Sequence, residues 1–61
     1  MFSVVARHDW MDSVWDVWVS RDDAVVGHYR VVADGKYDAT VDALVEHGLS
    51  VREAGRIAGG K

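Results

Sequence analysis

The chain has 61 residues, no cysteine and a formal net charge of −3. This length supports one small domain, and the lack of cysteine excludes disulfides and thiolate metal sites. The acidic balance is the opposite of the basic charge that a nucleic-acid-binding domain usually carries.

The N-terminal segment and the apolar runs bear on where the protein works. Residues 1–9 lack the basic start and long apolar stretch of a signal peptide, and no apolar run approaches the roughly 20 residues of a membrane helix. We therefore expect a soluble, cytoplasmic protein that does not bind membranes. Because a core of this size is small and disulfides do not brace it, we also expect a homodimer.

The first half of the chain alternates with a period of two residues. Segments 2–8, 13–21 and 24–33 are rich in Val, Trp, Tyr and Phe, which favour strands. The segments between them are short enough for hairpin loops. The pattern predicts a three-stranded antiparallel meander. Trp15 is expected in the core, on the same face as Val17 and Val19 and facing Gly27 or a helix.

The segment after the third strand has two interpretations. Asp34-Gly35 is a strong turn dipeptide, and a two-residue hairpin there would lead into a short fourth strand over residues 36–40. Alternatively, the dipeptide belongs to a loop that precedes a helix. The sequence pattern is compatible with both.

From Thr40 onward the periodicity changes to that of an amphipathic helix. Apolar residues recur at i, i+3 and i+4 in Val41, Leu44 and Val45. Asp38 or Thr40 is suited to the N-cap, and Gly48 is suited to the C′ position. This first helix is therefore expected to end near residue 48.

A second helix is predicted from Ser50. Ser50 and Glu53 have the spacing of a capping box, in which each side chain accepts a hydrogen bond from the other residue's N–H. The apolar stripe consists of Val51, Ala54, Ile57 and Ala58, and Gly59-Gly60 end the helix. The predicted fold class is α+β, with a sheet over residues 1–35 and a two-helix hairpin over residues 38–61 packed on one sheet face.

The helical segment contains a short motif. A Gly48-Leu49-Ser50 corner precedes the helix start Arg52-Glu53-Ala54, small Ala54 and Gly55 suit a close helix crossing, and a glycine follows at position 59. Residues 41–60 thereby resemble the first two helices of the tri-helical helix-turn-helix family of resolvases, transposases and small regulators. The family reads base edges with the next helix, for which only Lys61 remains here. We therefore prefer a plain amphipathic hairpin packed on the sheet.

The resemblance nevertheless implies an alternative function, that of a DNA-binding transcriptional regulator acting as a dimer. Residues 51–61 carry three cations and one acid, so any contact with phosphate would come from this segment. Arg52, Arg56 and Lys61 would be the contacts, mainly to phosphate.

The sheet face opposite Trp15 is the predicted binding site. Two helices cover one face of the sheet but not both, and the other face would present Val14, Trp18, Val26, His28, Arg30 and Val32. An uncovered surface with Trp, Arg and apolar side chains has the composition of a binding hot spot. We therefore predict a protein-protein interaction through Trp18, Val14, His28, Arg30 and Val32.

The titratable and nucleophilic side chains form no catalytic pattern. The histidines lack metal-ligand spacing, the serines lie in no nucleophile motif, and no glycine-rich loop opens a helix. Asp9, Asp12, Asp22 and Asp23 are expected in hairpin loops. We expect no catalysis, no metal and no cofactor.

The leading hypothesis is a small non-enzymatic regulatory module, of phage or mobile-element origin, that binds another protein. The DNA-binding regulator is the alternative. A third hypothesis rests on residues 1–50, which carry four cations and nine acids. Such an acidic sheet would mimic or displace DNA on a DNA-binding protein.

Overall fold

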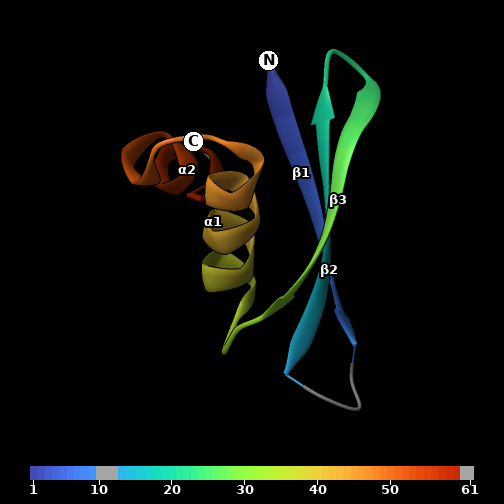
Figure 1. The fold of residues 1–61 in the computed structure, drawn as a ribbon, viewed down its shortest axis with the longest axis vertical. Coiled ribbons are helices and arrows are strands. Elements are labelled where there is room, and N and C mark those ends of the chain that lie inside the picture. The colour runs from blue at the N-terminus through green and yellow to red at the C-terminus, as the bar shows by residue number, and fades with distance from the viewer. Residues whose placement is uncertain (10–12, 60–61) are drawn as a thin grey trace.

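The chain folds into a three-stranded sheet followed by two helices, as a computed structural model shows for residues 1–9 and 13–59 (Figure 1). The elements are β1 (Phe2–Asp9), β2 (Val14–Arg21), β3 (Ala24–Val32), α1 (Lys36–His47) and α2 (Val51–Ala58). The strands are antiparallel in the order β1-β2-β3. The α+β class and the meander are thus confirmed. Both helices lie on the same side of the sheet.

A two-residue turn joins β2 to β3. Asp22 and Asp23 have φ values of 50° and 68°, the left-handed conformation that this hairpin turn requires and that Asp tolerates. The N-terminal ammonium group lies 2.9 Å from the Asp22 carboxylate. The predicted hairpin loop at these two acids is confirmed.

An extra residue interrupts the pairing of β2 with β3. Val19 pairs with Gly27, whereas Ser20 pairs with Val25, so Val26 has no counterpart on β2. Such a bulge shifts the alternation of side chains between the two faces. Strict alternation would place Val26 on the same face as His28. Because Val25 instead pairs with Ser20, it is Val25 that shares the face of Trp18 and His28.

The core lies between the sheet and the helices and is small. Six hydrophobic residues are fully buried in the described part of the chain: Val17, Val19, Ala39, Ala43, Leu44 and Ala54. Alanines predominate on the helices, so the helix backbones approach the valines of β2 closely. Phe2, Val4 and Tyr29 pack around this centre as partly buried neighbours.

Helix α1 begins at Lys36, which decides between the two interpretations of this segment and corrects the expected N-cap at Asp38 or Thr40. There is no fourth strand over residues 36–40, and the N-cap is Gly35, without a side-chain hydrogen bond. Thr40 lies inside the helix, where its Oγ1 donates to the Lys36 carbonyl over 2.8 Å. Ala39, in the first turn of this helix, is fully buried. A small residue contributes little to an apolar periodicity, so the first turn went unrecognised.

The corner between the helices agrees largely with its sequence pattern. Gly48 has φ 116°, and its N–H donates to the carbonyls of Leu44 and Val45, as expected at a C′ glycine. The Glu53 N–H donates to Ser50 Oγ over 3.2 Å. The Glu53 carboxylate lies 3.9 Å from Arg56, so only the first half of the predicted capping box is present among the described residues.

The predicted apolar stripe of α2 is wrong at its first position. Ala54 is fully buried, but Val51 is 69% exposed. The helix is rotated so that Ala54 and Ile57 contact the core around Leu44. Val51 therefore lies on the outer surface of the helical hairpin.

Aromatic side chains complete the covered face of the sheet. The Trp15 indole packs against the buried cluster of Val17, Ala39 and Ala43, and its Nε1 donates to the Ala33 carbonyl over 3.2 Å. Trp15 thus faces a helix, as expected. Tyr29 Oη and His47 Nδ1, 2.6 Å apart, satisfy each other between β3 and α1.

The space above Gly27 is already filled. A Cβ atom added there would lie 2.7 Å from Tyr29 Cε2 and 3.0 Å from His47 Nδ1. Glycine thus permits the Tyr29–His47 pair to lie across β3. Neither helix in the described residues is long and apolar enough to cross a membrane.

Candidate protein-binding face

The sheet surface that points away from the helices, here called the open face, is the candidate site. Val17 and Val19 point into the core, so the alternate residues of β2 point the other way. Through the pairing registers, the open face consists of Ser3, Val5, Arg7, Asp9, Val14, Asp16, Trp18, Ser20, Val25, His28, Arg30 and Val32. In the part of the chain described, no helix covers it (Figure 1).

Trp18 lies at the centre of the open face. It pairs with Val5 on β1 and with His28 on β3. The indole and imidazole rings stack with centroids 4.8 Å apart and planes inclined by 13°. Trp18 is partly buried, whereas Val5 and His28 are exposed. Strand β2 thus presents the flat indole ring of Trp18, and the His28 imidazole of β3 lies against it.

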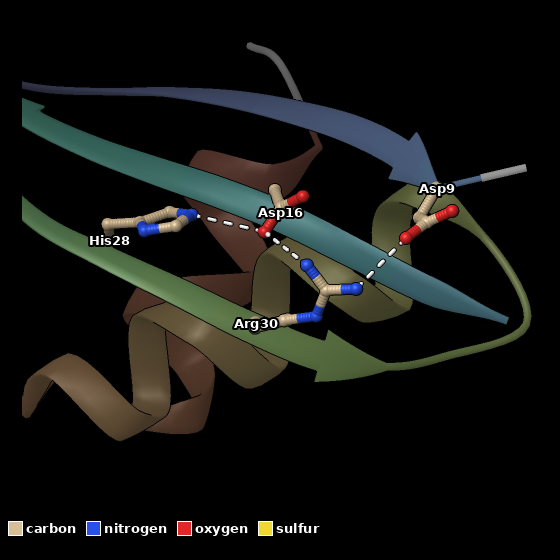
Figure 2. Close-up of polar contacts among 4 residues, drawn as sticks. All are labelled: Asp9, Asp16, His28 and Arg30. Carbon is tan, nitrogen blue, oxygen red and sulfur yellow. Dashed lines mark hydrogen bonds and ion pairs between the residues drawn. The ribbon is translucent and has the colours of Figure 1, made fainter. Parts of the chain in front are cut away.

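Asp9, Asp16, His28 and Arg30 form a connected network of two ion pairs and one hydrogen bond, here called the ion-pair network (Figure 2). His28 Nε2 lies 3.1 Å from Asp16 Oδ1, and Arg30 lies 3.7 Å from the same oxygen. The Arg30 guanidinium also donates to Asp9 Oδ2 over 2.9 Å. Arg30 therefore joins the carboxylates of β1 and β2 from its place on β3.

The network is held at the surface rather than in the core. The Arg30 side chain is 58% exposed, and that of Asp16 is 21% exposed. Ion pairs at this exposure contribute little to stability, because water and salt screen them. They place the Arg30 and His28 side chains against the carboxylates of Asp9 and Asp16, next to Trp18.

The far end of the open face is apolar. Val14 and Val32 pair across β2 and β3, and the Val32 side chain is 74% exposed. The five residues predicted from the sequence, Val14, Trp18, His28, Arg30 and Val32, therefore lie on one continuous surface of the structure.

Two residues of the ion-pair network were not among the predicted site residues. Asp9 was expected in a hairpin loop, but it is the last residue of β1 and binds Arg30. Asp16 forms the centre of the ion-pair network, between His28 and Arg30. The register of β2 with β3, which places Asp16 opposite Arg30, is the signal that would have identified this pair.

The residues of the DNA-binding alternative lie elsewhere. Arg52 and Arg56 are exposed on α2. Arg56 shares a 3.9 Å ion pair with Glu53. Lys61, the third predicted contact, lies outside the described residues, as do Trp10 and Asp12.

The open face contains a shallow hollow, which is lined by Arg7, His8, Asp9, Asp16, Trp18, His28 and Arg30. The carboxylates of Asp9 and Asp16 are held in ion pairs there. Across residues 1–9 and 13–59, no group of three or more histidine, aspartate or glutamate side chains has the arrangement of a metal site.

No protein family model matches the chain, and neither does any curated protein or solved structure.

Proposed function

We propose that this chain is a small non-enzymatic regulatory module that binds another protein through its open face. The observation that carries the proposal is the stack of Trp18 on His28 at the centre of a sheet surface that the helices leave uncovered. Tryptophan and arginine are the residue types that most often dominate the energetics of protein interfaces.

The ion-pair network favours binding because it limits the ordering that binding requires. Long side chains that become immobilised in an interface cost roughly 0.5–1.5 kcal/mol each. Arg30 is already held by Asp9 and Asp16 before any partner arrives. The open face is therefore preorganised around Trp18.

The distribution of charge suggests how a partner approaches. Asp22 and Asp23 lie exposed in the turn at one end of the sheet, and the chain as a whole is acidic. Complementary charge increases the rate of encounter more than the final affinity. We therefore expect a partner with a basic rim around an apolar contact region.

The test compares two aromatic truncations, one at the centre of the open face and one outside it. Trp18→Ala removes the centre of the open face, whereas Tyr37→Ala removes an exposed aromatic ring of α1. Each variant is immobilised and used to capture proteins from the native host, with identification by mass spectrometry. The proposal predicts a protein retained by the wild type and by Tyr37→Ala but lost with Trp18→Ala.

Circular dichroism separates a lost interface from a lost fold. Trp18→Ala should melt close to the wild-type temperature, because Trp18 lies outside the buried core. A large fall in melting temperature would make Trp18 a core residue and end the argument for a binding face. Equal capture by wild type and Trp18→Ala would likewise contradict the proposal.

DNA binding remains the second candidate, because Arg52 and Arg56 are exposed one helical turn apart on α2. Contact with phosphate weakens steeply as salt rises. A gel shift on random duplex at low and high salt tests this candidate. Binding at low salt that is lost with Arg52→Gln/Arg56→Gln would support it, and no binding at low salt would exclude it.

A further inference from the structure

A groove lies on the helical side of the molecule, away from Trp18. Its floor consists of Val32, Tyr37, Val41, Val45, Val51 and Gly55, contributed by the end of β3 and by both helices. Eight large hydrophobic side chains are exposed in the described residues, and four of them line this groove: Val32, Tyr37, Val45 and Val51. The groove is therefore a second apolar surface, which adjoins the open face at Val32.

An acidic ridge borders the groove along α1. Asp38, Asp42 and Glu46 of α1, and Asp34 just before the helix, recur every four residues and line the two adjoining hollows that make up the groove. Like charges at this spacing repel one another along a helix. None of these four acids forms an ion pair with another described residue. A cationic surface placed against the ridge would relieve the repulsion.

A basic ridge borders the same groove along α2. Val51 and Gly55 line the groove, and Arg52 and Arg56 each follow them by one position. Residues at i and i+4 lie on the same side of a helix, and successive residues are roughly 100° apart around its axis. The two arginines therefore share the outer side of α2, next to the side that lines the groove. Both are exposed, and the Arg56–Glu53 contact at 3.9 Å is too open to occupy the arginine firmly.

Because the groove has one acidic and one basic border, the grooves of two copies of the chain are complementary in charge. A two-fold rotation brings the basic border of one copy against the acidic border of the other, and the reverse contact forms at the same time. We infer that a second copy of this chain occupies the groove. Arg52 and Arg56 of each copy then face Asp42 and Glu46 of the other, with Val45 and Val51 buried between them.

The dimer would add apolar burial to a domain whose own core is small. Leu44, Val17 and Val19 are the largest side chains that are fully buried. Covering the exposed valines of the groove would add apolar burial, at roughly 25 cal/mol per Å² of surface removed from water. The dimer leaves the centre of the open face free, so each assembly would present two copies of the Trp18 surface.

Charge reversal tests the reciprocal contact. The acidic-border variant is Asp42→Lys/Glu46→Lys, which avoids the first turn of α1. The basic-border variant is Arg52→Glu/Arg56→Glu. Sedimentation should show a dimer for the wild type and a dissociation constant raised about tenfold or more for each variant alone. An equimolar mixture of the two variants should recover the dimer, because both of its contacts then join opposite charges.

Several outcomes would overturn the inference. They are a monomeric wild type, a dimer unaffected by either variant, and a mixture that fails to recombine. Trp18→Ala is the control and should keep the dimer mass; if it dissociates the dimer, the open face is the self-association surface instead. Circular dichroism confirms that each variant is folded. If a reversal unfolds the chain, the neutral pair Arg52→Gln/Arg56→Gln replaces it and should still weaken the dimer.

Discussion

The two faces of the sheet are made by the same three strands but are stabilised in different ways. On the covered face, Val17 and Val19 are fully buried beneath α1 and α2. On the open face, Trp18 is only partly buried and its neighbours are joined by solvent-exposed ion pairs. Apolar burial contributes far more free energy than surface ion pairs do. The covered face therefore determines stability, and the open face is available for function.

The largest effect is expected in the core between the covered face and the helices. Leu44→Ala removes the largest fully buried side chain and should lower the free energy of unfolding by about 2–5 kcal/mol. This is a large part of the stability of a small domain. Urea unfolding followed by circular dichroism measures the change. Val5→Ala, an equivalent apolar truncation on the open face, should change stability by about 0.5 kcal/mol or less.

A similar result for Leu44→Ala and Val5→Ala would contradict the comparison. It would mean that the open face is packed as tightly as the core. The Val5 side chain is 63% exposed, so its truncation leaves no enclosed cavity.

A smaller effect is expected where the covered face is crowded. Gly27→Ala introduces a Cβ atom against Tyr29 and His47, and such overpacking costs about 1–3 kcal/mol. The measurement is again the free energy of unfolding. In a Tyr29→Ala background the closest contact is absent, so the same substitution should cost clearly less. An equal loss of stability in both backgrounds would mean that Gly27→Ala acts through the backbone of β3 and not through contacts with the Tyr29 ring.

The fold was largely predictable because its strands follow a regular alternation. Three strands, their order along the chain and the turn at Asp22-Asp23 all follow from that pattern. The alternation failed at Val25 and Val26, since a bulge adds one residue without any mark in the composition. The start of α1 was missed because Ala39 and Ala43 are too small to register as an apolar stripe.

The open face was only partly predictable. Trp18, His28 and Arg30 were assigned to one surface because they occupy matching positions in adjacent strands. The roles of Asp9 and Asp16 depend on which residues lie opposite each other across three strands. That register is set by the turn and the bulge together, and neither is specified by alternation alone.

The smallest effect on stability is expected for the ion-pair network. Arg30→Ala removes two contacts, one with Asp9 and one with Asp16, yet the exposure of the guanidinium limits the loss to about 1 kcal/mol or less. The difference from wild type should shrink as salt is added, because screening weakens the wild-type pairs. In a double-mutant cycle, Arg30→Ala combined with Asp9→Asn isolates the coupling between the two side chains.

Arg30 is also the residue at which stability and function should separate most clearly. Truncation of an interface arginine that is held in place before binding should cost more in partner affinity than in folding, because the partner loses an ordered cation next to Trp18. Two measurements on Arg30→Ala, each relative to wild type, separate these effects. The affinity for the captured partner reports the loss of binding, and the urea midpoint reports the loss of stability. A loss of stability as large as the loss of affinity would show that the network is structural, and the distinction between the two faces would then not hold at Arg30.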